Sequence, residues 1–162
     1  MTDLDERRWL HDTLTRQIPL GGAMALTVDR LDGDGIELAA PLAPNVNDKG
    51  TAFGGALVSL MILAGWSLPR LILRRAGVRA ELVIGRCEVR FLAPVSGEFR
   101  AVCPFPGEPA VEAFLRGVRE RGKGRLDMAP EIRVETARGT AVAARLEARY
   151  AGLAVAQEDP VS

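Results

Sequence analysis

A long stretch without charged residues constrains the fold of this chain more than any other feature. Residues 52–68 contain no Asp, Glu, Lys or Arg, and their only hydroxyl groups belong to two serines. A helix that is apolar on every side must be wrapped by other helices or by a curved sheet. The stretch ends at Pro69, short of the roughly 20 residues that a bilayer span requires. We therefore predict a buried helix over residues 53–76, kinked or broken at Gly65 or Pro69.

The segments around this helix alternate between apolar and polar residues, as strands with one buried face do. In residues 79–94, for example, Cys87 and Val89 alternate with Glu88 and Arg90. Five or six such strands around one wrapped helix predict an α+β fold, an antiparallel sheet curled around the helix. The remaining expected elements are strands at residues 23–31, 35–40, 97–105, 126–134 and 142–150, and helices at residues 4–17 and 109–121.

Charge and composition limit the partners that this chain can bind. Lys plus Arg and Asp plus Glu number 21 each, so no overall field attracts nucleic acid or an anionic membrane. The first residues lack the apolar run of a signal peptide, and two cysteines suit a reducing compartment. We therefore expect a cytoplasmic protein with one domain over residues 1–162, and a loose tail after residue 150.

Histidine is scarce enough to exclude several kinds of chemistry. His11 is the only one, so a Ser-His-Asp triad would have to use it. One histidine and two cysteines at unrelated spacings make no metal motif, and no nucleotide-binding glycine motif is present. The sequence therefore predicts no metal and no nucleotide cofactor.

A polar loop leads directly into the apolar helix. Asn45, Asn47 and Asp48 precede the pair Gly54-Gly55. The first turn of a helix has unpaired N–H groups and a partial positive charge, and glycines let a ligand approach the backbone. The arrangement suits binding and polarising a carbonyl oxygen. Alternatively, these residues only form a turn and cap a core helix.

The order of these residues resembles that of a known group of enzymes. Asn47, Gly50 and Phe53-Gly54-Gly55 follow the N-x-x-G-x-x-H-G-G signature of hotdog-fold acyl-thioester enzymes, with phenylalanine where histidine is usual. The longer string NVNDKGTAFGGALVSLMILAGW resembles the YiiD C-terminal domain family. This resemblance covers about residues 10–152.

The resemblance implies a fold, an assembly and a class of substrate. It implies a hotdog fold, a homodimer or larger homo-oligomer, and an acyl thioester carried on the phosphopantetheine of acyl carrier protein or on coenzyme A. No other cofactor is implied. Members are labelled as thioesterases, and part of the family is linked to decarboxylation of malonyl groups on acyl carrier protein.

The residues around the glycine pair favour decarboxylation over hydrolysis. In related hotdog thioesterases an acidic residue on the central helix or in the preceding loop activates water. This chain has Ile62 at the helical position, and Asp48 is the only acid near the glycines. Decarboxylation of a malonyl thioester needs no base for carbon–carbon cleavage, only donors to the enolate oxygen. The catalytic candidates are Asn45, Asn47 and Asp48, and the substrate-binding candidates are Thr51 (also placed to cap the helix), Phe53, Gly54, Gly55 and Ser59.

Three functions stay open at this point. The first is a malonyl-acyl carrier protein decarboxylase that feeds the initiation of fatty acid synthesis, and the second is an acyl-CoA or acyl carrier protein thioesterase. The third is a non-catalytic acyl-binding subunit. The basic residues Arg121, Lys123 and Arg125 either form a solvated turn or bind coenzyme A phosphates or the acidic face of a carrier protein.

Overall fold

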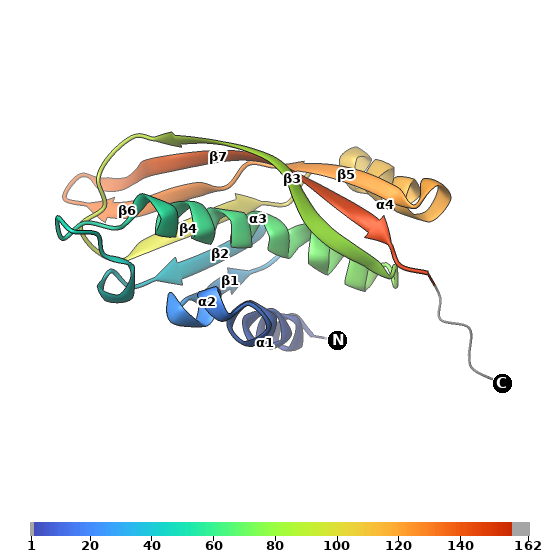
Figure 1. Cartoon of the computed structure of the whole chain (residues 1–162), viewed down its shortest axis with the longest axis horizontal. Coiled ribbons are helices and arrows are strands. Elements are labelled where there is room, and N and C mark those ends of the chain that lie inside the picture. The colour runs from blue at the N-terminus through green and yellow to red at the C-terminus, as the bar shows by residue number, and fades with distance from the viewer. Residues whose placement is uncertain (1, 157–162) are drawn as a thin grey trace.

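The computed structural model describes residues 2–156 of the chain. Its longest helix, α3 (Gly54–Arg75), packs against a curled antiparallel sheet (Figure 1). The other helical elements are α1 (Asp3–Asp12), a π-helical turn (Thr13–Gln17), α2 (Pro19–Ala23), a 3-10 turn (Ala43–Asn45) and α4 (Glu108–Arg121).

The sheet has seven strands, and every pairing in it is antiparallel. The strand order is β1-β2-β4-β6-β7-β3, and β5 pairs with β7 beside this path. The alternation expected over residues 126–134 divides into two strands, β5 and β6. The strands are β1 (Thr27–Leu31), β2 (Gly35–Ala40), β3 (Ala80–Phe91), β4 (Phe99–Pro104), β5 (Lys123–Met128), β6 (Glu131–Thr136) and β7 (Gly139–Ala154).

Helix α3 forms the centre of the core, as its apolar sequence predicts. Leu57 is 3% exposed and Met61 is fully buried. The expected break at Gly65 or Pro69 is wrong, because the helix continues through both to Arg75. Gly65 instead allows a close approach: a Cβ there would lie 2.6 Å from the Tyr150 hydroxyl oxygen. This helix wrapped by a curled sheet confirms the expected hotdog fold.

By length and composition alone, α3 would also suit a membrane span. In the structure, 67% of its most apolar 18-residue window is buried inside the protein. The helix therefore serves as the core of the fold.

The two ends of the chain differ from the sequence expectation in detail. Residues 4–17 are helical as expected, but Pro19 opens the short helix α2 instead of ending the helical region. Proline at the first position of a helix loses no hydrogen bond, because that N–H has no partner in the helix. Part of the tail expected to be loose belongs to β7, and residues 157–162 lie outside the described residues.

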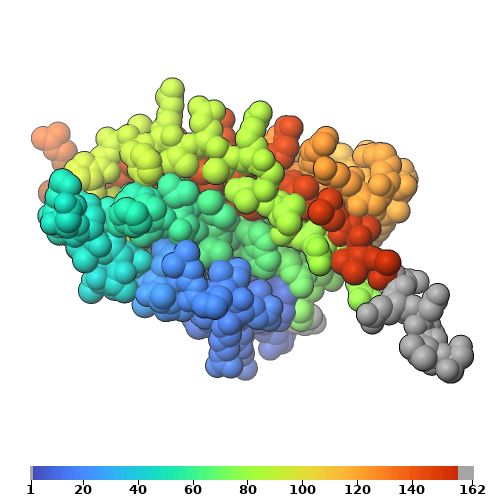
Figure 2. Space-filling view, viewed as in Figure 1, coloured from blue at the N-terminus to red at the C-terminus, as the bar shows by residue number. Residues whose placement is uncertain are grey.

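Strand β3 is an edge of the sheet. It pairs with β7 on one side and with no strand on the other among the described residues. Figure 2 shows this segment, in yellow-green, along one border of the molecule. Apolar side chains on it remain open to solvent, including Val83 at 44% and Phe91 at 58% exposure.

Candidate active site

The loop before α3 is shaped mainly by Asn47. Its Oδ1 accepts hydrogen bonds from the backbone N–H groups of Lys49 (2.8 Å) and Thr51 (3.1 Å). Its Nδ2 donates to Thr51 Oγ1 at 2.8 Å. The loop turns at Gly50, whose φ of 80° is in the region that favours glycine. Asn47 therefore holds the loop closed and has one amide hydrogen left for another acceptor.

Asn45 connects the loop to the end of α2 and to the residue that follows β2. Its side chain is buried, and Nδ2 donates to Met24 O (3.0 Å) and to Pro41 O (2.8 Å). An amide nitrogen carries two hydrogens, so both are used. Asn45, one of the catalytic candidates, therefore has no amide hydrogen left for a thioester oxygen in this geometry. The arrangement instead makes Asn45 a residue that positions the loop.

Asp48 is largely exposed to solvent. Its side chain is 82% exposed and pairs with Lys49 at 3.0 Å. A carboxylate in this position meets bulk water and the neighbouring ammonium group. A catalytic role for Asp48 therefore stays a prediction.

The first turn of α3 presents open backbone donors. Phe53 is its N-cap and makes no side-chain cap bond, so the expected cap by Thr51 is wrong. Phe53 O accepts from the N–H groups of Ala56 (2.9 Å) and Leu57 (3.2 Å). Among residues 2–156, no acceptor bonds the N–H groups of Gly54 and Gly55. Two donors at the positive end of a long helix are thus left for a ligand oxygen.

An apolar hollow of about 320 Å³ lies beside this turn. Phe53, Gly55 and Ser59 contribute from α3 and its N-cap, and Ser59 Oγ is held by a 2.8 Å bond to Gly55 O. The Phe53 ring covers Gly55 so closely that a Cβ there would lie 2.4 Å from a ring carbon. None of the lining residues that the structure describes is ionisable. They are Leu20, Ala23, Met24, Pro44, Asn45, Val46, Phe53, Gly55, Ala56 and Ser59.

The basic turn lies at the other end of α3. Arg121, Lys123 and Arg125 are exposed where α4 leads into β5, and Arg119 of the same helix donates to Ala76 O at 3.2 Å. The 22 residues of α3 separate this end from the glycine pair by about 33 Å. Figure 1 shows α4 and β5 far from the start of α3. The structure therefore places the basic residues far from the glycine pair and from the loop before it.

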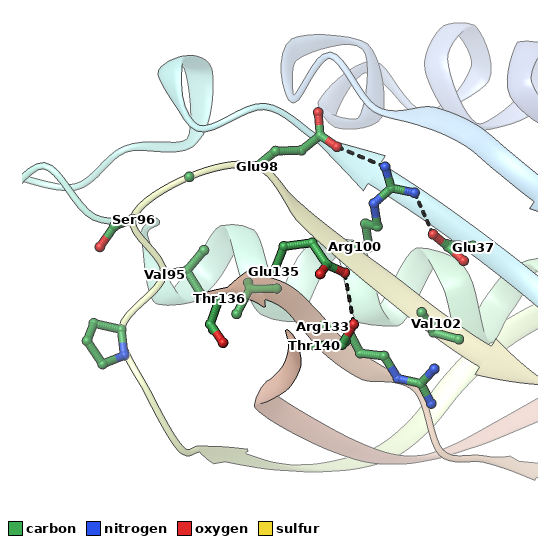
Figure 3. Close-up of a pocket in the computed structure, with 13 residues that line it drawn as sticks. Glu37, Val95, Ser96, Glu98, Arg100, Val102, Arg133, Glu135, Thr136 and Thr140 are labelled. Carbon is green, nitrogen blue, oxygen red and sulfur yellow. Dashed lines mark hydrogen bonds and ion pairs between the residues drawn. The ribbon is translucent and has the colours of Figure 1, made fainter. Parts of the chain in front are cut away.

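A larger, polar hollow of about 700 Å³ lies on the sheet and was not expected from the sequence. It is lined by charged residues of β2, β4 and β6, among them Glu37, Arg100 and Arg133 (Figure 3). Arg100 Nη1 pairs with Glu37 Oε1 at 2.6 Å, and Nη2 pairs with Glu98 at 3.2 Å. Its charge is thus matched by carboxylates already present.

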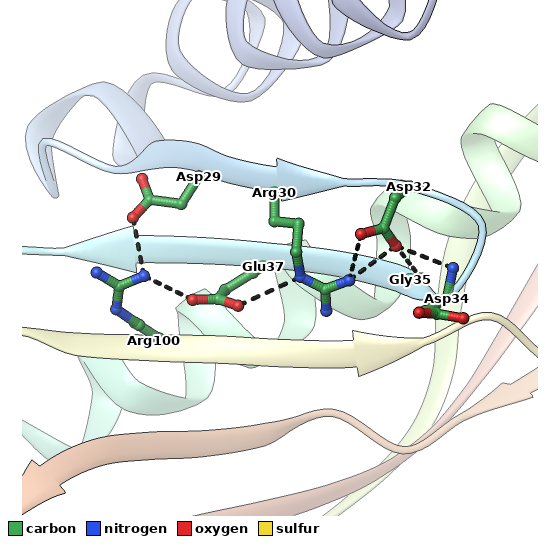
Figure 4. A network of polar contacts seen from close by, with 7 residues as sticks. All are labelled: Asp29, Arg30, Asp32, Asp34, Gly35, Glu37 and Arg100. Carbon is green, nitrogen blue, oxygen red and sulfur yellow. Dashed lines mark hydrogen bonds and ion pairs between the residues drawn. The ribbon is translucent and has the colours of Figure 1, made fainter. Parts of the chain in front are cut away.

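The same charges continue as a chain of ion pairs along the sheet (Figure 4). Arg100 also contacts Asp29 at 3.1 Å, and Arg30 lies 3.5 Å from Glu37 and 2.7 Å from Asp32. The hydrogen bond from Arg30 lowers the pKa of Asp32 below its usual range. The arginines and carboxylates of this network pair with one another. We therefore interpret the network as one that stabilises the outer face of the sheet.

The remaining reactive groups lie outside the apolar hollow. Cys103 is buried in β4, and burial raises the pKa of its thiol to about 12, so it is not a thiolate near neutral pH. Cys87 is exposed on β3. Within residues 2–156, no three His, Cys, Asp or Glu side chains gather into a metal-binding group.

The hotdog fold and the apolar hollow beside open N–H groups suit an enzyme of the acyl-thioester class. A family model described as "Putative thioesterase (yiiD_Cterm)" matches residues 7–154. The chain belongs to this family.

Solved structures agree on the fold. A protein of unknown function from Chlorobaculum tepidum is 28% identical, with 92% of this chain and 94% of that chain covered and a TM-score of 0.86. A thioesterase-labelled protein from Shewanella oneidensis is 22% identical, with 92% and 98% covered and a TM-score of 0.77. A third, from Pseudomonas aeruginosa and described as a probable thioesterase, is 22% identical, with 91% and 95% covered and a TM-score of 0.73.

Proposed function

We propose that this protein decarboxylates a malonyl thioester carried on acyl carrier protein or coenzyme A and releases the acetyl thioester. One observation chiefly supports this proposal: the apolar hollow lies beside two open backbone donors, and no ionisable side chain of residues 2–156 lines it. Hydrolysis needs a group that activates water. Carbon–carbon cleavage needs only stabilisation of the negative charge that develops on the thioester oxygen.

The proposed chemistry uses the backbone of Gly54 and Gly55. The bond between the carboxylate carbon and the α-carbon breaks, its electron pair forms the enolate, and carbon dioxide leaves. The two N–H groups stabilise the enolate oxygen, and the α-carbon then takes a proton from water. Each donor of this kind contributes on the order of 3 kcal/mol in the transition state.

The apolar lining and the loop have supporting roles in this scheme. A carboxylate beside Met24, Val46 and Ala56 is poorly hydrated, which favours the loss of its charge as carbon dioxide. Asn45 positions the loop, and the unused amide hydrogen of Asn47 is the side-chain candidate for a third donor. Phe53 takes the place of the usual histidine and bounds the hollow as an apolar wall.

A thioesterase is the second candidate, because the description of the family favours it. In that case Asp48 or a partner residue would have to reach the substrate, since Asp48 is 82% exposed. A non-catalytic acyl-binding role is the third.

The decisive experiment is mass spectrometry of malonyl-acyl carrier protein after incubation with the pure protein. The decarboxylase proposal predicts acetyl-acyl carrier protein, with a mass lower by one carbon dioxide. A free phosphopantetheine thiol would support the thioesterase instead. An unchanged malonyl group would support the acyl-binding subunit.

We also propose that the protein is a homodimer formed through β3. An unpaired edge of 12 residues with exposed apolar side chains is a template for another strand. Isologous two-fold symmetry makes such edge pairing antiparallel. Half-buried apolar side chains of α3, Val58, Ile62 and Trp66, would gain cover from the second copy.

Light scattering coupled to size exclusion tests the dimer. The native protein should run as a dimer, and the Val83→Glu/Ile84→Glu variant as a monomer, because paired edges would bring like charges together. The matched control is Leu4→Glu, an exposed apolar residue of α1 (65%) away from the edge, which should remain dimeric. A native monomer would contradict the proposal.

The basic turn also enters the proposal. Arg121, Lys123 and Arg125 would contact the acidic face of the carrier protein. The length of α3 separates this turn from Gly54. A carrier protein could therefore reach both only if it were large, or if a second chain supplied one of the two sites.

A further inference from the structure

The apolar hollow beside the first turn of α3 is larger than a malonyl group requires. Its volume is about 320 Å³. Since one water molecule occupies about 30 Å³ of the liquid, this space holds on the order of ten groups of that size. On the same scale, the α-carbon and the carboxylate of a malonyl group account for about four. Space for a short alkyl chain is therefore left beside them.

The hollow has a buried apolar floor. Met24 is 3% exposed and Ala56 is 8% exposed. The polar side chains of the described lining are those of Asn45 and Ser59, and both use their hydrogens within the protein. The Asn45 amide donates to two backbone carbonyls, and the Ser59 hydroxyl donates to Gly55 O. The side chains of the lining thus offer an anion no donor, whereas an alkyl group needs none.

The rim of the hollow is apolar as well, although it is open to solvent. Leu20 of α2 is 55% exposed, Val46 of the loop is 46% exposed, and Phe53 at the N-cap of α3 is 58% exposed. Large apolar side chains that gather at one opening are typical of a ligand-binding groove. A carboxylate gains no hydrogen bond from them and loses hydration beside them. The rim therefore suits an apolar part of a ligand.

We propose that the site also accepts malonyl thioesters that carry a short alkyl group, such as methyl or ethyl, on the α-carbon. This inference rests on the proposed decarboxylase function and extends it to a second class of substrate. Gly55 lines the hollow and carries an open N–H, so a thioester oxygen bound there brings the α-carbon to the edge of the hollow. The alkyl group then lies in the hollow against Met24 and Ala56.

The reaction follows the same steps as for a malonyl group. The bond between the carboxylate carbon and the α-carbon breaks, its electron pair forms the enolate, and carbon dioxide leaves. The α-carbon then takes a proton from water, so an ethylmalonyl thioester gives a butyryl thioester. The alkyl group takes no part in bond breaking and contributes only the free energy of burying its apolar surface.

The test compares kcat/KM for malonyl-, methylmalonyl- and ethylmalonyl-acyl carrier protein, with mass spectrometry of the products. Each methylene that the hollow buries should raise kcat/KM about fourfold, so the value for ethylmalonyl should exceed that for malonyl about tenfold or more. If malonyl is decarboxylated and ethylmalonyl has an equal or lower kcat/KM, this inference is overturned and the decarboxylase function stands. No turnover of any of the three would overturn both.

Two variants connect the preference to the hollow. Ala23→Leu fills the rim at an exposed position of α2, and Leu20→Ala removes apolar contact from the rim. Each should lower the ratio of the two kcat/KM values, ethylmalonyl over malonyl, about fourfold or more, the effect of one buried methylene. The matched control is Ala113→Leu, at an exposed position of α4 far from the hollow (Figure 1). It should leave the ratio within about twofold.

These variants also distinguish the alkyl group from other occupants of the rim. A ratio that Ala23→Leu leaves unchanged, or that Ala113→Leu lowers equally, would overturn the assignment to this hollow. A ratio unchanged in Leu20→Ala, together with a lower mass in light scattering, would assign the rim to a second copy of the chain instead. Circular dichroism checks that each variant is folded.

Discussion

The two ends of helix α3 differ in whether their terminal backbone groups are hydrogen-bonded. At the N-terminal end, no side chain caps the first turn, and the N–H groups of Gly54 and Gly55 have no acceptor among the described residues. At the C-terminal end, backbone bonds from Gly77 and Val78 close the helix. Apolar side chains surround the first end, whereas arginines surround the second.

This contrast indicates which end of α3 contributes to stability and which end contributes to function. A helix end that is closed by its own backbone gains stability from a completed hydrogen-bond ladder. A helix end left open beside an apolar hollow gives up such bonds and retains donors for a ligand. The open end is therefore the part of α3 that the proposed chemistry uses, and the closed end anchors the helix in the fold.

The largest expected effect on stability concerns the loop before the open end. Asn45→Ala would leave the buried carbonyls of Met24 and Pro41 without their donor, so we expect a loss of about 2–4 kcal/mol in the free energy of unfolding. Chemical denaturation measures this loss. Asp48→Ala, on the exposed side of the same loop, is the control and should change stability by less than about 0.5 kcal/mol. A stable Asn45→Ala protein with lost turnover would make Asn45 catalytic.

A smaller effect is expected at the closed end. Arg75 lowers the pKa of Glu6 below its ordinary value of 4.5, chiefly by its hydrogen bonds. A lowered pKa in the folded state stabilises the protein above that ordinary value, and the contribution is lost as pH falls through the folded pKa. Glu6→Gln should therefore cost about 1–2 kcal/mol at pH 7 and progressively less below about pH 4.5.

Thermal unfolding followed across pH tests this prediction. Glu98→Gln, whose side chain is 58% exposed beside Arg100, is the control and should differ little from the parent at any pH. A Glu6→Gln deficit that persists unchanged at low pH would show that charge is not its cause.

The smallest expected effect separates decarboxylation from hydrolysis. Asp48→Asn should leave the turnover of a malonyl thioester within about twofold, because no base takes part in carbon–carbon cleavage. Steady-state release of carbon dioxide measures it. A fall of about 100-fold or more would instead make Asp48 the base of a thioesterase.

The sequence predicted the parts of this molecule that depend on local pattern. The apolar run predicted α3 nearly to its ends, and the full burial of Met61 follows from its lack of a polar face. The break expected at Pro69 did not occur, because packing of the helix against the sheet overrides a local preference. The glycine pair at the start of α3 was also found from sequence.

The parts that it could not predict depend on contacts between distant segments. An asparagine in a loop can be structural or catalytic, so the sequence left the role of Asn45 open. In the structure its side chain donates to Met24 O, 21 positions away in the chain. The stacking of Arg70 and Arg74 on Trp9 joins α3 to α1 in the same way. No spacing rule connects these positions, so only the folded structure shows them together.

The open backbone donors can be tested one atom at a time. Gly54 is the first helical residue, where proline is tolerated, and Phe53 has the extended backbone (φ −64°, ψ 131°) that a following proline requires. A Cβ at Gly54 would have ordinary contacts, 3.5 Å from the Phe91 ring. Gly54→Pro therefore removes the N–H with little change in the fold, and Gly54→Ala adds a Cβ but keeps the N–H.

The comparison of these two variants in malonyl-thioester decarboxylation tests whether the open N–H groups of α3 act in catalysis. We expect Gly54→Pro to lower kcat by about 100- to 1,000-fold, as the loss of one donor to a developing oxyanion does. Gly54→Ala should stay within a few-fold of the parent, and both should unfold at nearly the parent temperature. Equal turnover in the two variants would contradict the claim that the open end of α3 is the catalytic site.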